Sequence, residues 1–351
     1  MKICRHYGVC GGCSLQNLSA ADYRSHKRDL VIKALARAGL TDVAVEEPFL
    51  VPEKSRRRAV FKFGKEQGGV VAGFHAAKSH AIVDMRECLV LTPVLLHLTD
   101  LLRDRFGPLL AEGEKAEVHV MESDAGLDLG FRWRRKLTPQ LTAEIAGAFS
   151  GENIARIIFN GEILTERQKP QLAFDGIAIV PPPHAFLQAS REGEAVLQTR
   201  VLALMEGAKA IADLFAGLGT FTLPLARRAR VHAVEQDDEA LTALAAATRK
   251  AKGLKPITTE KRDLFKLPLT PLELNKFDAV LLDPPRAGAE AQFKALAASK
   301  IRRIAYVSCD AGSFARDVAI LARAGFRPGP VQPVDQFLYS NHIELVCGFT
   351  R

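Results

Sequence analysis

The sequence lacks any run of about 18 apolar residues, the length that a helix needs to cross a membrane. Its first residues, MKICRHYGVCGGC, also lack the apolar segment of a signal peptide. We therefore expect a cytoplasmic protein with no membrane partner. Internal repeats and low-complexity segments are absent too, and a hydrophobic content of 48% argues against a disordered chain.

Cysteine is scarce, since the 351 residues contain only six. In a reducing compartment, so few cysteines in a long chain are typical of metal ligands, nucleophiles or core residues and not of disulfides. A formal net charge of +8 favours a polyanionic partner such as nucleic acid. Because no obligatory protein partner is evident, we expect a monomer.

The pattern of predicted elements changes near VPPPHAFLQAS, whose three prolines are incompatible with a helix or a central strand. We place a domain boundary there, between an α+β domain at residues 1–184 and a second domain at residues 185–351. The first domain has a predicted helix around residues 20–38 and short strands such as RRRAVFKFG. In the second, apolar strands alternate with amphipathic helices, which predicts an α/β fold with a largely parallel sheet covered on both faces. The last run, HIELVCGFT, predicts a closing antiparallel pair at the sheet edge.

Glycines and acids follow successive predicted strands of the second domain. In DLFAGLGTFTLPLA, Gly217 and Gly219 allow a tight turn and close approach of a ligand, although the third glycine of the dinucleotide fingerprint is missing. Glu235, Asp263 and Asp283 end the next three strands, so they converge with the glycine turn at one edge of the sheet. So many acids suit S-adenosylmethionine, which has no phosphate and one sulfonium charge, better than a pyrophosphate cofactor.

The motifs DLFAGLGTF, VE, DPPRAG, SCDAGSFARD and DQFLYSNHIE, in this order, resemble those of the bacterial RNA (uracil-5-)-methyltransferases that use S-adenosylmethionine. The resemblance implies a Rossmann-like class I methyltransferase domain. It also implies cofactor contacts by Gln188 in FLQAS and by Phe215 and Thr220 in the glycine turn. Ser190 stands where the family usually has asparagine.

Methylation of carbon 5 of uracil needs a thiolate that adds to carbon 6. Cys309, at the end of the predicted strand IAYVS, stands where this nucleophile is required, and the start of the following helix is expected to lower its thiol pKa. Glu344 in HIELV occupies the position that the family uses for the base that removes the carbon-5 proton. Asp310 and Gly312, beside Cys309, depart from the family's usual residues.

Four further cysteines are candidate metal ligands. Cys4, Cys10 and Cys13 lie close together in CRHYGVCGGC, and Cys88 in MRECLV supplies a fourth thiolate. Four cysteines bind either zinc or an iron–sulfur cluster. Three close cysteines with a remote fourth favour the cluster, and zinc is the alternative. Family members with this spacing hold a 4Fe–4S cluster, so the resemblance implies one here, in a structural role.

Basic and aromatic residues are interleaved in KSRRRAVFKFGK and FRWRRK, a pattern that suits phosphate contacts and base stacking. From these segments, with Trp133 as a stacking surface, we predict RNA contacts by Arg56, Arg57, Arg58, Lys62, Arg132 and Arg134.

The cysteines begin at residue 4, without the TRAM-type domain that begins many relatives, as in the shorter 23S ribosomal RNA enzymes. We therefore expect a uridine of 23S rRNA as the substrate. A uridine in the T-loop of tRNA is the alternative substrate. A non-catalytic iron–sulfur protein that binds RNA is the alternative of another class.

Overall fold

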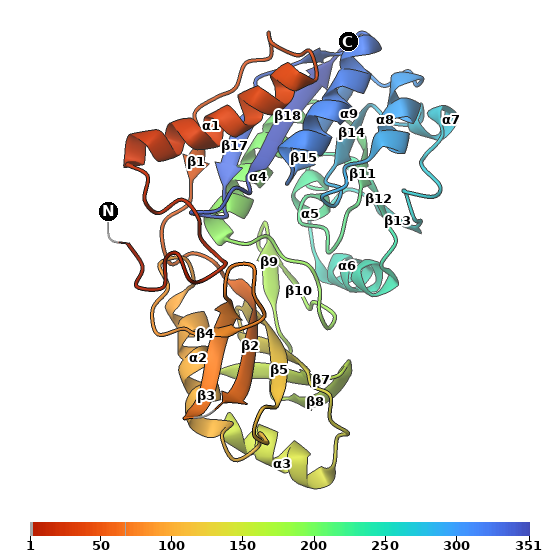
Figure 1. Cartoon of the computed structure of the whole chain (residues 1–351). Helices are drawn as coiled ribbons and strands as arrows, with labels where there is room; N and C mark the ends of the chain where they lie inside the picture. Colours follow the sequence, from red (N-terminus) through yellow and green to blue (C-terminus); the bar gives the residue numbers. More distant parts are fainter. Residues whose placement is uncertain (1–2, 67) are drawn as a thin grey trace.

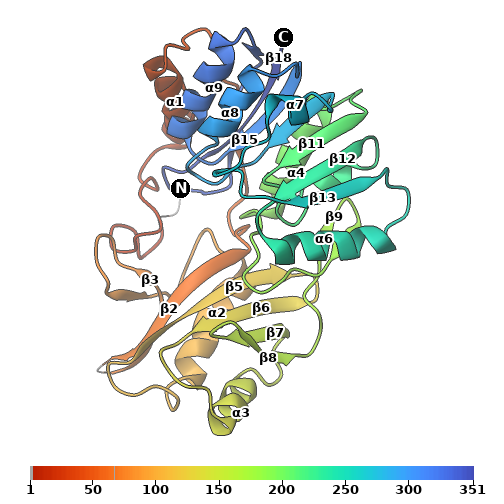
Figure 2. The same cartoon turned by 90° about the vertical axis from the view of Figure 1, so that its right-hand side faces the viewer.

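The computed structural model describes residues 3–66 and 68–351. Figures 1 and 2 show that the chain folds into two lobes, each built around a β-sheet. Within these described residues, the upper lobe has a nine-stranded sheet and the lower lobe a seven-stranded one. No helix in this part of the chain is apolar and long enough to span a membrane.

The upper sheet has the strand order β1-β17-β18-β15-β14-β11-β12-β13, with β16 paired to β18. Its strands are β1 (Phe49–Leu50), β11 (Ala210–Leu214), β12 (Arg230–Glu235), β13 (Ile257–Lys261), β14 (Ala279–Leu282), β15 (Arg303–Ser308), β16 (Arg327–Pro328), β17 (Gln332–Asp335) and β18 (Glu344–Thr350). The run from β15 to β13 is parallel, and β18 is antiparallel to both β15 and β17. Both the predicted parallel sheet and its antiparallel closing pair are confirmed.

Helices cover both faces of this sheet. They are α1 (Ala20–Arg37), α4 (Arg191–Leu204), α5 (Thr222–Leu225), α6 (Asp238–Lys250), α7 (Pro271–Leu274), α8 (Glu290–Ala297) and α9 (Ala311–Arg323). Consecutive residues of β15 point to opposite faces of the sheet. Tyr306 packs with Phe293 of α8 on one face, whereas Val307 packs in the cluster that contains Leu197 of α4 on the other. A strand buried on both sides therefore has a continuous apolar sequence.

The N-terminal helix belongs to the upper lobe. The helix predicted around residues 20–38 is confirmed as α1, but its apolar residues Val31 and Leu35 are buried in the same core as β14 and β15. In addition, β1 pairs in parallel with β17 at the sheet edge. The predicted boundary near residue 184 therefore does not separate the two lobes by itself. Residues 20–50, which lie before this boundary in the chain, pack on the upper sheet and not on the lower one.

The lower sheet has the order β4-β3-β2-β5-β6-β7-β8, in which β6 and β7 are parallel and the other neighbours antiparallel. Its elements are β2 (Arg58–Glu66), β3 (Gly69–His75), β4 (Ile82–Asp84), α2 (Pro93–Arg105), β5 (Lys115–Ser123), β6 (Gly126–Arg132), α3 (Pro139–Ala148), β7 (Ile154–Phe159) and β8 (Glu162–Glu166). Phe61 and Phe63 alternate with Lys62, so that one face of β2 enters the core while the other points away from it.

A small hairpin, β9 (Leu172–Phe174) with β10 (Ile177–Ile179), stands between the lobes and packs on α6.

Candidate active site

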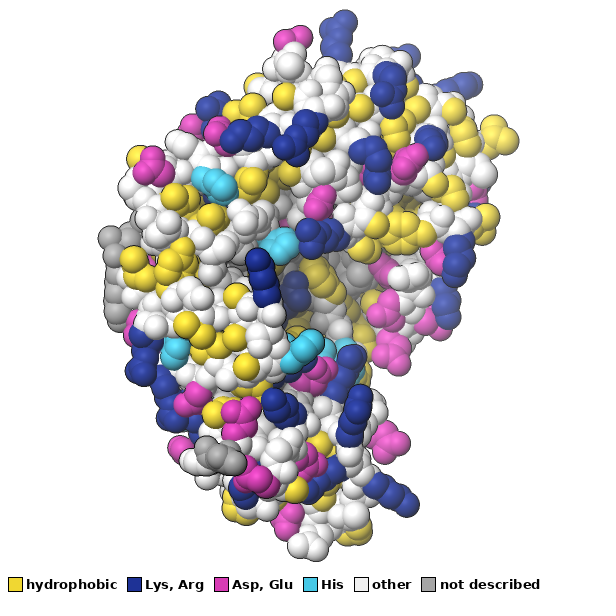
Figure 3. Space-filling model, viewed as in Figure 1, with side chains coloured by type: hydrophobic (Ala, Val, Ile, Leu, Met, Phe, Trp, Pro, Cys, Tyr) yellow, Lys and Arg dark blue, Asp and Glu magenta, His cyan; other side chains and the backbone are white. Residues whose placement is uncertain are grey.

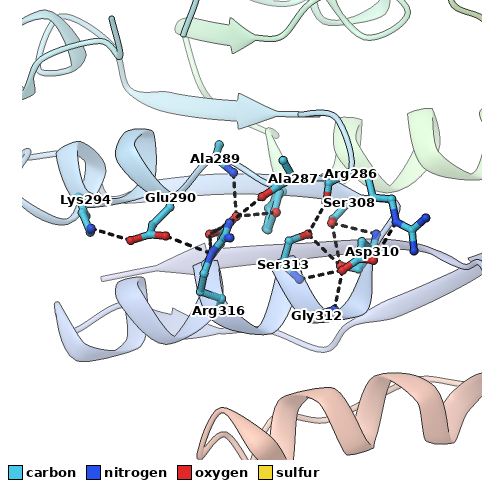
Figure 4. Close-up of polar contacts among 12 residues, drawn as sticks. Arg286, Ala287, Ala289, Glu290, Lys294, Ser308, Asp310, Gly312, Ser313 and Arg316 are labelled. Atoms are coloured by element: carbon cyan, nitrogen blue, oxygen red, sulfur yellow. Dashed lines mark hydrogen bonds and ion pairs between the residues drawn. The ribbon is translucent and has the colours of Figure 1, made fainter. Parts of the chain in front are cut away.

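Cys309 lies directly after β15, in the short turn that leads into α9. Asp310 caps that helix: its Oδ1 accepts hydrogen bonds from the backbone N–H groups of Gly312 and Ser313, both at 2.9 Å. Its Oδ2 accepts a hydrogen bond from Arg286 Nε at 3.2 Å (Figure 4). A Cβ at Gly312 would lie 3.1 Å from Asp310 Oδ1. These two unusual residues therefore fix the turn that carries Cys309.

A buried carboxylate of α9 holds the loop that follows β14. Asp317 accepts a hydrogen bond from the backbone N–H of Ala289 at 2.9 Å, and Arg316 donates to Asp317 (Figure 4). Gly288 has a φ of +73°, and a Cβ there would lie 2.5 Å from atoms of both Arg316 and Asp317. Only glycine fits this approach. The loop that begins with Asp283 is thereby fixed against the helix that follows Cys309.

Cys309 and Glu344 lie at the same end of two paired strands. Strands β15 and β18 are antiparallel, and their pairing ends with Ser308 opposite Leu345. Cys309 directly follows Ser308, and Glu344 directly precedes Leu345 as the first residue of β18. The charge of Glu344 also raises the pKa of Cys309. The predicted nucleophile and the predicted base, 35 residues apart in the numbering of the chain, are thus close together.

Burial raises the pKa of Cys309 and of the two acids near it, and the charge of Glu344 adds to this effect on Asp283 and Cys309. Burial raises the pKa of Glu344 to about 7, while a hydrogen bond from Gln336 and the charge of Arg58 act in the opposite direction. Burial, and then the charge of Glu344, raise the pKa of Asp283 well above its usual value. Burial, followed by the charges of Glu344 and Asp283, raises the pKa of Cys309 to about 12. The expectation that the helix start lowers the thiol pKa is therefore wrong, because burial and two carboxylates outweigh it.

Two glutamines connect these acids. Gln188 Nε2 lies 3.4 Å from Asp283 Oδ2, and Gln188 Oε1 accepts a hydrogen bond of 2.6 Å from Gln336 Nε2. Ser190, which replaces the usual asparagine, caps α4 by accepting the N–H of Gly193 at 3.0 Å. Gln336 lies in the motif DQFLYSNHIE, but it was not predicted to be a site residue.

The glycine turn lies at the same edge of the sheet. Gly217 N–H donates to Glu235 Oε2 at 3.0 Å, which joins the turn after β11 to the end of β12. Phe215 has a φ of +63°, a conformation that non-glycine residues seldom adopt and that clusters at functional sites. Thr220 is half-buried, and its carbonyl oxygen accepts a hydrogen bond from Gln198 at 2.9 Å.

Two more acids complete this edge. Asp263 follows β13 and is paired with Lys266 at 3.0 Å, which lowers the pKa of Asp263. Asp213, in the DLFAG motif, was not predicted to be a site residue. It is fully buried, and Thr222 donates to its Oδ2 at 2.5 Å, but its Oδ1 has no partner among the described residues. Burial raises the pKa of Asp213 to about 7. A buried, unpaired acceptor in this position suits a hydrogen-bond donor of a bound ligand.

Comparisons with known proteins agree with this arrangement. Residues 183–350 match the family model described as tRNA (Uracil-5-)-methyltransferase. The chain is 44% identical to an uncharacterised RNA methyltransferase of Rhizobium meliloti (strain 1021), over 98% of this chain and 84% of that protein. It belongs to the RNA (uracil-5-)-methyltransferase family.

Other relatives extend the comparison. The enzyme is 32% identical to a 23S rRNA (uracil(1939)-C(5))-methyltransferase of Ralstonia pickettii (strain 12J), over 99% of this chain and 83% of that protein. A tRNA (uracil-54, C5)-methyltransferase of Pyrococcus abyssi, solved with S-adenosyl-L-homocysteine, shares its fold with a TM-score of 0.77 and 23% identity, over 99% of this chain and 88% of that one. The enzyme is thus an S-adenosylmethionine-dependent RNA (uracil-5-)-methyltransferase with an α/β methyltransferase fold.

The four N-terminal cysteines of the enzyme line one cavity of about 50 Å³, between the N-terminal segment and the lower lobe. Burial raises the pKa values of Cys10 and Cys88, and raises that of Cys13 to about 12. Hydrogen bonds act in the opposite direction: Gly12 N–H donates to Cys10 Sγ at 3.4 Å. Within residues 3–66 and 68–351, however, no three Cys, His, Asp or Glu side chains are grouped closely enough to hold a metal ion, so a metal site is not shown.

The predicted RNA-binding residues fall into two environments. Arg57 is inside the protein, with its side chain 4% exposed, where it pairs with Glu194 at 2.7 Å and donates to the backbone oxygen of Gln188. Trp133 is also buried, at 3% exposure, and its indole N–H donates to Glu114. Neither side chain is available to RNA, so the expectations for Arg57 and Trp133 are corrected to structural roles.

The other basic residues lie along two adjoining hollows. A cleft of about 730 Å³ is lined by Lys62, Arg132 and Arg134, and His184 joins it to a second one of about 210 Å³ lined by Arg56 and Arg58. Figure 3 shows Lys, Arg and His side chains gathered around the hollow between the lobes.

Arg58 stands at the end of this surface that lies nearest the catalytic residues. Its guanidinium is 4.6 Å from the ring centre of Phe186, and it interacts electrostatically with both Glu344 and Cys309. Arg58 Nε is buried and without a hydrogen-bond partner among the described residues.

Proposed function

We propose that this enzyme methylates carbon 5 of a uridine in 23S rRNA, with Cys309 as the nucleophile and Glu344 as the base. The observation that carries the proposal is the β15–β18 pairing, which ends at Ser308 and Leu345 and so brings the adjacent thiol of Cys309 and the buried carboxyl of Glu344 together, at the edge of the sheet where the glycine turn and the cofactor acids meet. The name of the Ralstonia relative supports 23S rRNA as the substrate.

The proposed reaction uses each group in turn. The Cys309 thiolate forms a bond with carbon 6, and the electron pair of the carbon 5–carbon 6 double bond moves into an enolate. Carbon 5 then takes the methyl group of S-adenosylmethionine, whose sulfur keeps the bonding pair. The Glu344 carboxylate removes the carbon-5 proton, the double bond re-forms, and the thiolate leaves carbon 6. Because the target carbon lies within a base stack, the uridine must be unstacked or flipped out.

The pKa values of Cys309 and Glu344 fit their different roles as nucleophile and base. With a pKa of about 12, Cys309 is a protonated thiol in the free enzyme at neutral pH, so it must give its proton to solvent as it attacks carbon 6 of the bound RNA. Glu344, with a pKa of about 7, is half-ionised there and can accept a proton in the elimination step.

We propose that Gln188, Phe215, Gly217, Thr220, Glu235, Asp263 and Asp283 form the cofactor site. The contact between Gly217 and Glu235 and the strained φ of Phe215 support this assignment. A bound S-adenosylmethionine would supply the methyl group, and the acids would interact with its positive charge and hydroxyls.

We further propose that Cys4, Cys10, Cys13 and Cys88 hold a 4Fe–4S cluster with a structural role. Four thiols line one cavity and have the right chemistry for a cluster, although the described side chains are not grouped closely enough to hold a metal ion in this structure. The N–H of Gly12, which donates to Cys10 Sγ, is of the kind that stabilises thiolate ligands. Anaerobically purified protein should be brown and contain about four irons per chain, and Cys13→Ser should lose them. Stoichiometric zinc without visible absorbance would contradict the cluster.

For RNA contacts, we propose the surface lined by Arg56, Arg58, Lys62, Arg132 and Arg134. These residues line the two adjoining hollows that end near the catalytic residues, which suits a strand of RNA whose target base turns into the site.

The matched family model and the Pyrococcus enzyme are both named for tRNA, which favours a uridine of tRNA as a second candidate substrate. Mass-spectrometric mapping of 5-methyluridine in RNA from a deletion strain separates the two. Loss of the modified nucleoside from 23S rRNA alone supports the proposal, and loss from tRNA alone would transfer the activity to tRNA.

A further inference from the structure

Gln336 occupies an unusual place for an amide side chain. It is 1% exposed and follows the last residue of β17. Its Nε2 donates to Gln188 Oε1 at 2.6 Å, and its Oε1 lies 3.4 Å from the backbone N–H of Ser190. Its side chain also lies close enough to Glu344 to lower the pKa of that carboxyl. Polar contacts therefore run from Asp283 through Gln188 to Gln336, beside Glu344.

The contacts allow only one orientation of the Gln336 amide. With the NH₂ group directed at the Gln188 oxygen and the oxygen toward the N–H of Ser190, both neighbours match as acceptor and donor. The reversed amide would place its oxygen against the Gln188 oxygen and its NH₂ group against the N–H of Ser190 in a buried site, which is costly.

The backbone at this point is fixed by a buried charge pair. Asp335, the residue before Gln336, accepts hydrogen bonds from Lys27 Nζ at 2.8 Å and from Tyr23 O–H at 2.5 Å. Val334 pairs with Glu344 in the β17–β18 register, and Gln336, two residues later, projects to the same face. The side chain of Gln336 is thus held at the side of Glu344 by helix α1.

We propose that Gln336 is a positioning residue for the reaction: it orients the Glu344 carboxylate for proton removal and couples it to Gln188 on the cofactor side. This inference rests on the proposed function, in which Glu344 is the base. Gln336 itself does not touch the reacting atoms.

The charged groups that face Glu344 determine how the loss of Gln336 should change the pKa of Glu344. They are Arg58 from β2, Asp283 after β14 and Cys309 after β15. Burial raises the pKa of Glu344, while Gln336 and Arg58 lower it. Removing the Gln336 donor leaves Arg58 alone to favour the carboxylate, so that more of Glu344 is protonated at neutral pH and proton removal slows.

The test is the pH dependence of adduct breakdown in Gln336→Met, a variant that keeps the side-chain length and loses the donors. In single-turnover reactions with 23S rRNA fragments, the covalent protein–RNA adduct is followed by denaturing electrophoresis. We expect the midpoint of the breakdown rate to move upward by about one to two pH units, the effect of one hydrogen bond to a carboxylate. A midpoint equal to that of the unmodified enzyme would overturn the proposal.

Matched variants separate positioning from general damage. Gln332→Met changes a buried glutamine on β17, four residues before Gln336, whose amide donates to the Glu47 carbonyl, and should leave the midpoint in place. Gln336→Asn keeps the amide but is one methylene too short; it provides the same test should the methionine variant fail to fold, and an unshifted midpoint there would also contradict the proposal. Failure of the proposed function has a different signature, because the unmodified enzyme would then form neither the adduct nor 5-methyluridine.

Discussion

Lys27→Met tests whether helix α1 is an essential part of the catalytic lobe. The Lys27 and Asp335 side chains are both 0% exposed, with Nζ 2.8 Å from Oδ1, and Lys27 Nζ also donates to the His342 carbonyl oxygen at 2.6 Å. Without the ammonium group, the donors that Asp335 keeps among residues 3–66 and 68–351 are the neutral Tyr23 O–H and Phe337 N–H. Removing one partner of a buried ion pair costs about 3–5 kcal/mol of folding free energy.

Urea unfolding followed by circular dichroism measures this loss. The matched control is Lys33→Met on the same helix, where the ion pair with Asp29 is 3.5 Å long and its side chains are 68% and 51% exposed. An exposed pair contributes at most about 1 kcal/mol. The double variant Lys27→Met/Asp335→Leu should recover much of the stability, because no buried charge is then left alone. If Lys27→Met loses no more stability than Lys33→Met, helix α1 is not an essential part of the catalytic lobe.

Three further predictions concern the reaction. Cys309→Ala should abolish methylation while S-adenosylmethionine binding, measured by calorimetry, stays within a factor of about three, since its ligands are elsewhere; retained turnover would exclude the covalent mechanism. Glu344→Ala should accumulate a protein–RNA adduct that survives denaturing electrophoresis, whereas a change in RNA affinity alone would exclude Glu344 as the base. Because Glu344 is a carboxylate only above its pKa of about 7, the adduct-breakdown rate of the unmodified enzyme should fall as the pH drops below about 7, and a flat rate down to about pH 5 would contradict this role.

The catalytic edge could be predicted from the sequence because its signals are local. Glycines after one strand, acids after the next three and a cysteine at the end of a fifth all follow from the rule that the carboxyl ends of parallel strands share one edge. The antiparallel return of HIELVCGFT could be predicted because no helix lies between it and the preceding strand VQPVDQF, and parallel neighbours need a longer crossover connection. That Cys309 and Glu344 lie close together needed the pairing of β15 with β18, which only the structure supplies.

The failures come from long-range burial. KSRRRAVFKFGK has the pattern of a uniformly basic surface, yet Arg57 points inward because Glu194 of α4 meets it there. Trp133 fills the core of the lower lobe instead of offering a stacking face. The domain boundary was placed by prolines, but the apolar side of α1 packs against strands β14 and β15, far along the chain, a pairing that no local pattern reveals.

The most direct test of the proposed mechanism uses RNA in which 5-fluorouridine replaces uridine. Fluorine at carbon 5 cannot be removed as a proton by Glu344, so methyl transfer should stop at the covalent stage. Mass spectrometry of the digested complex should find the peptide containing Cys309 linked to a methylated 5-fluorouridine. A linkage to any other cysteine, or methyl transfer to RNA without a linkage, would contradict Cys309 as the nucleophile.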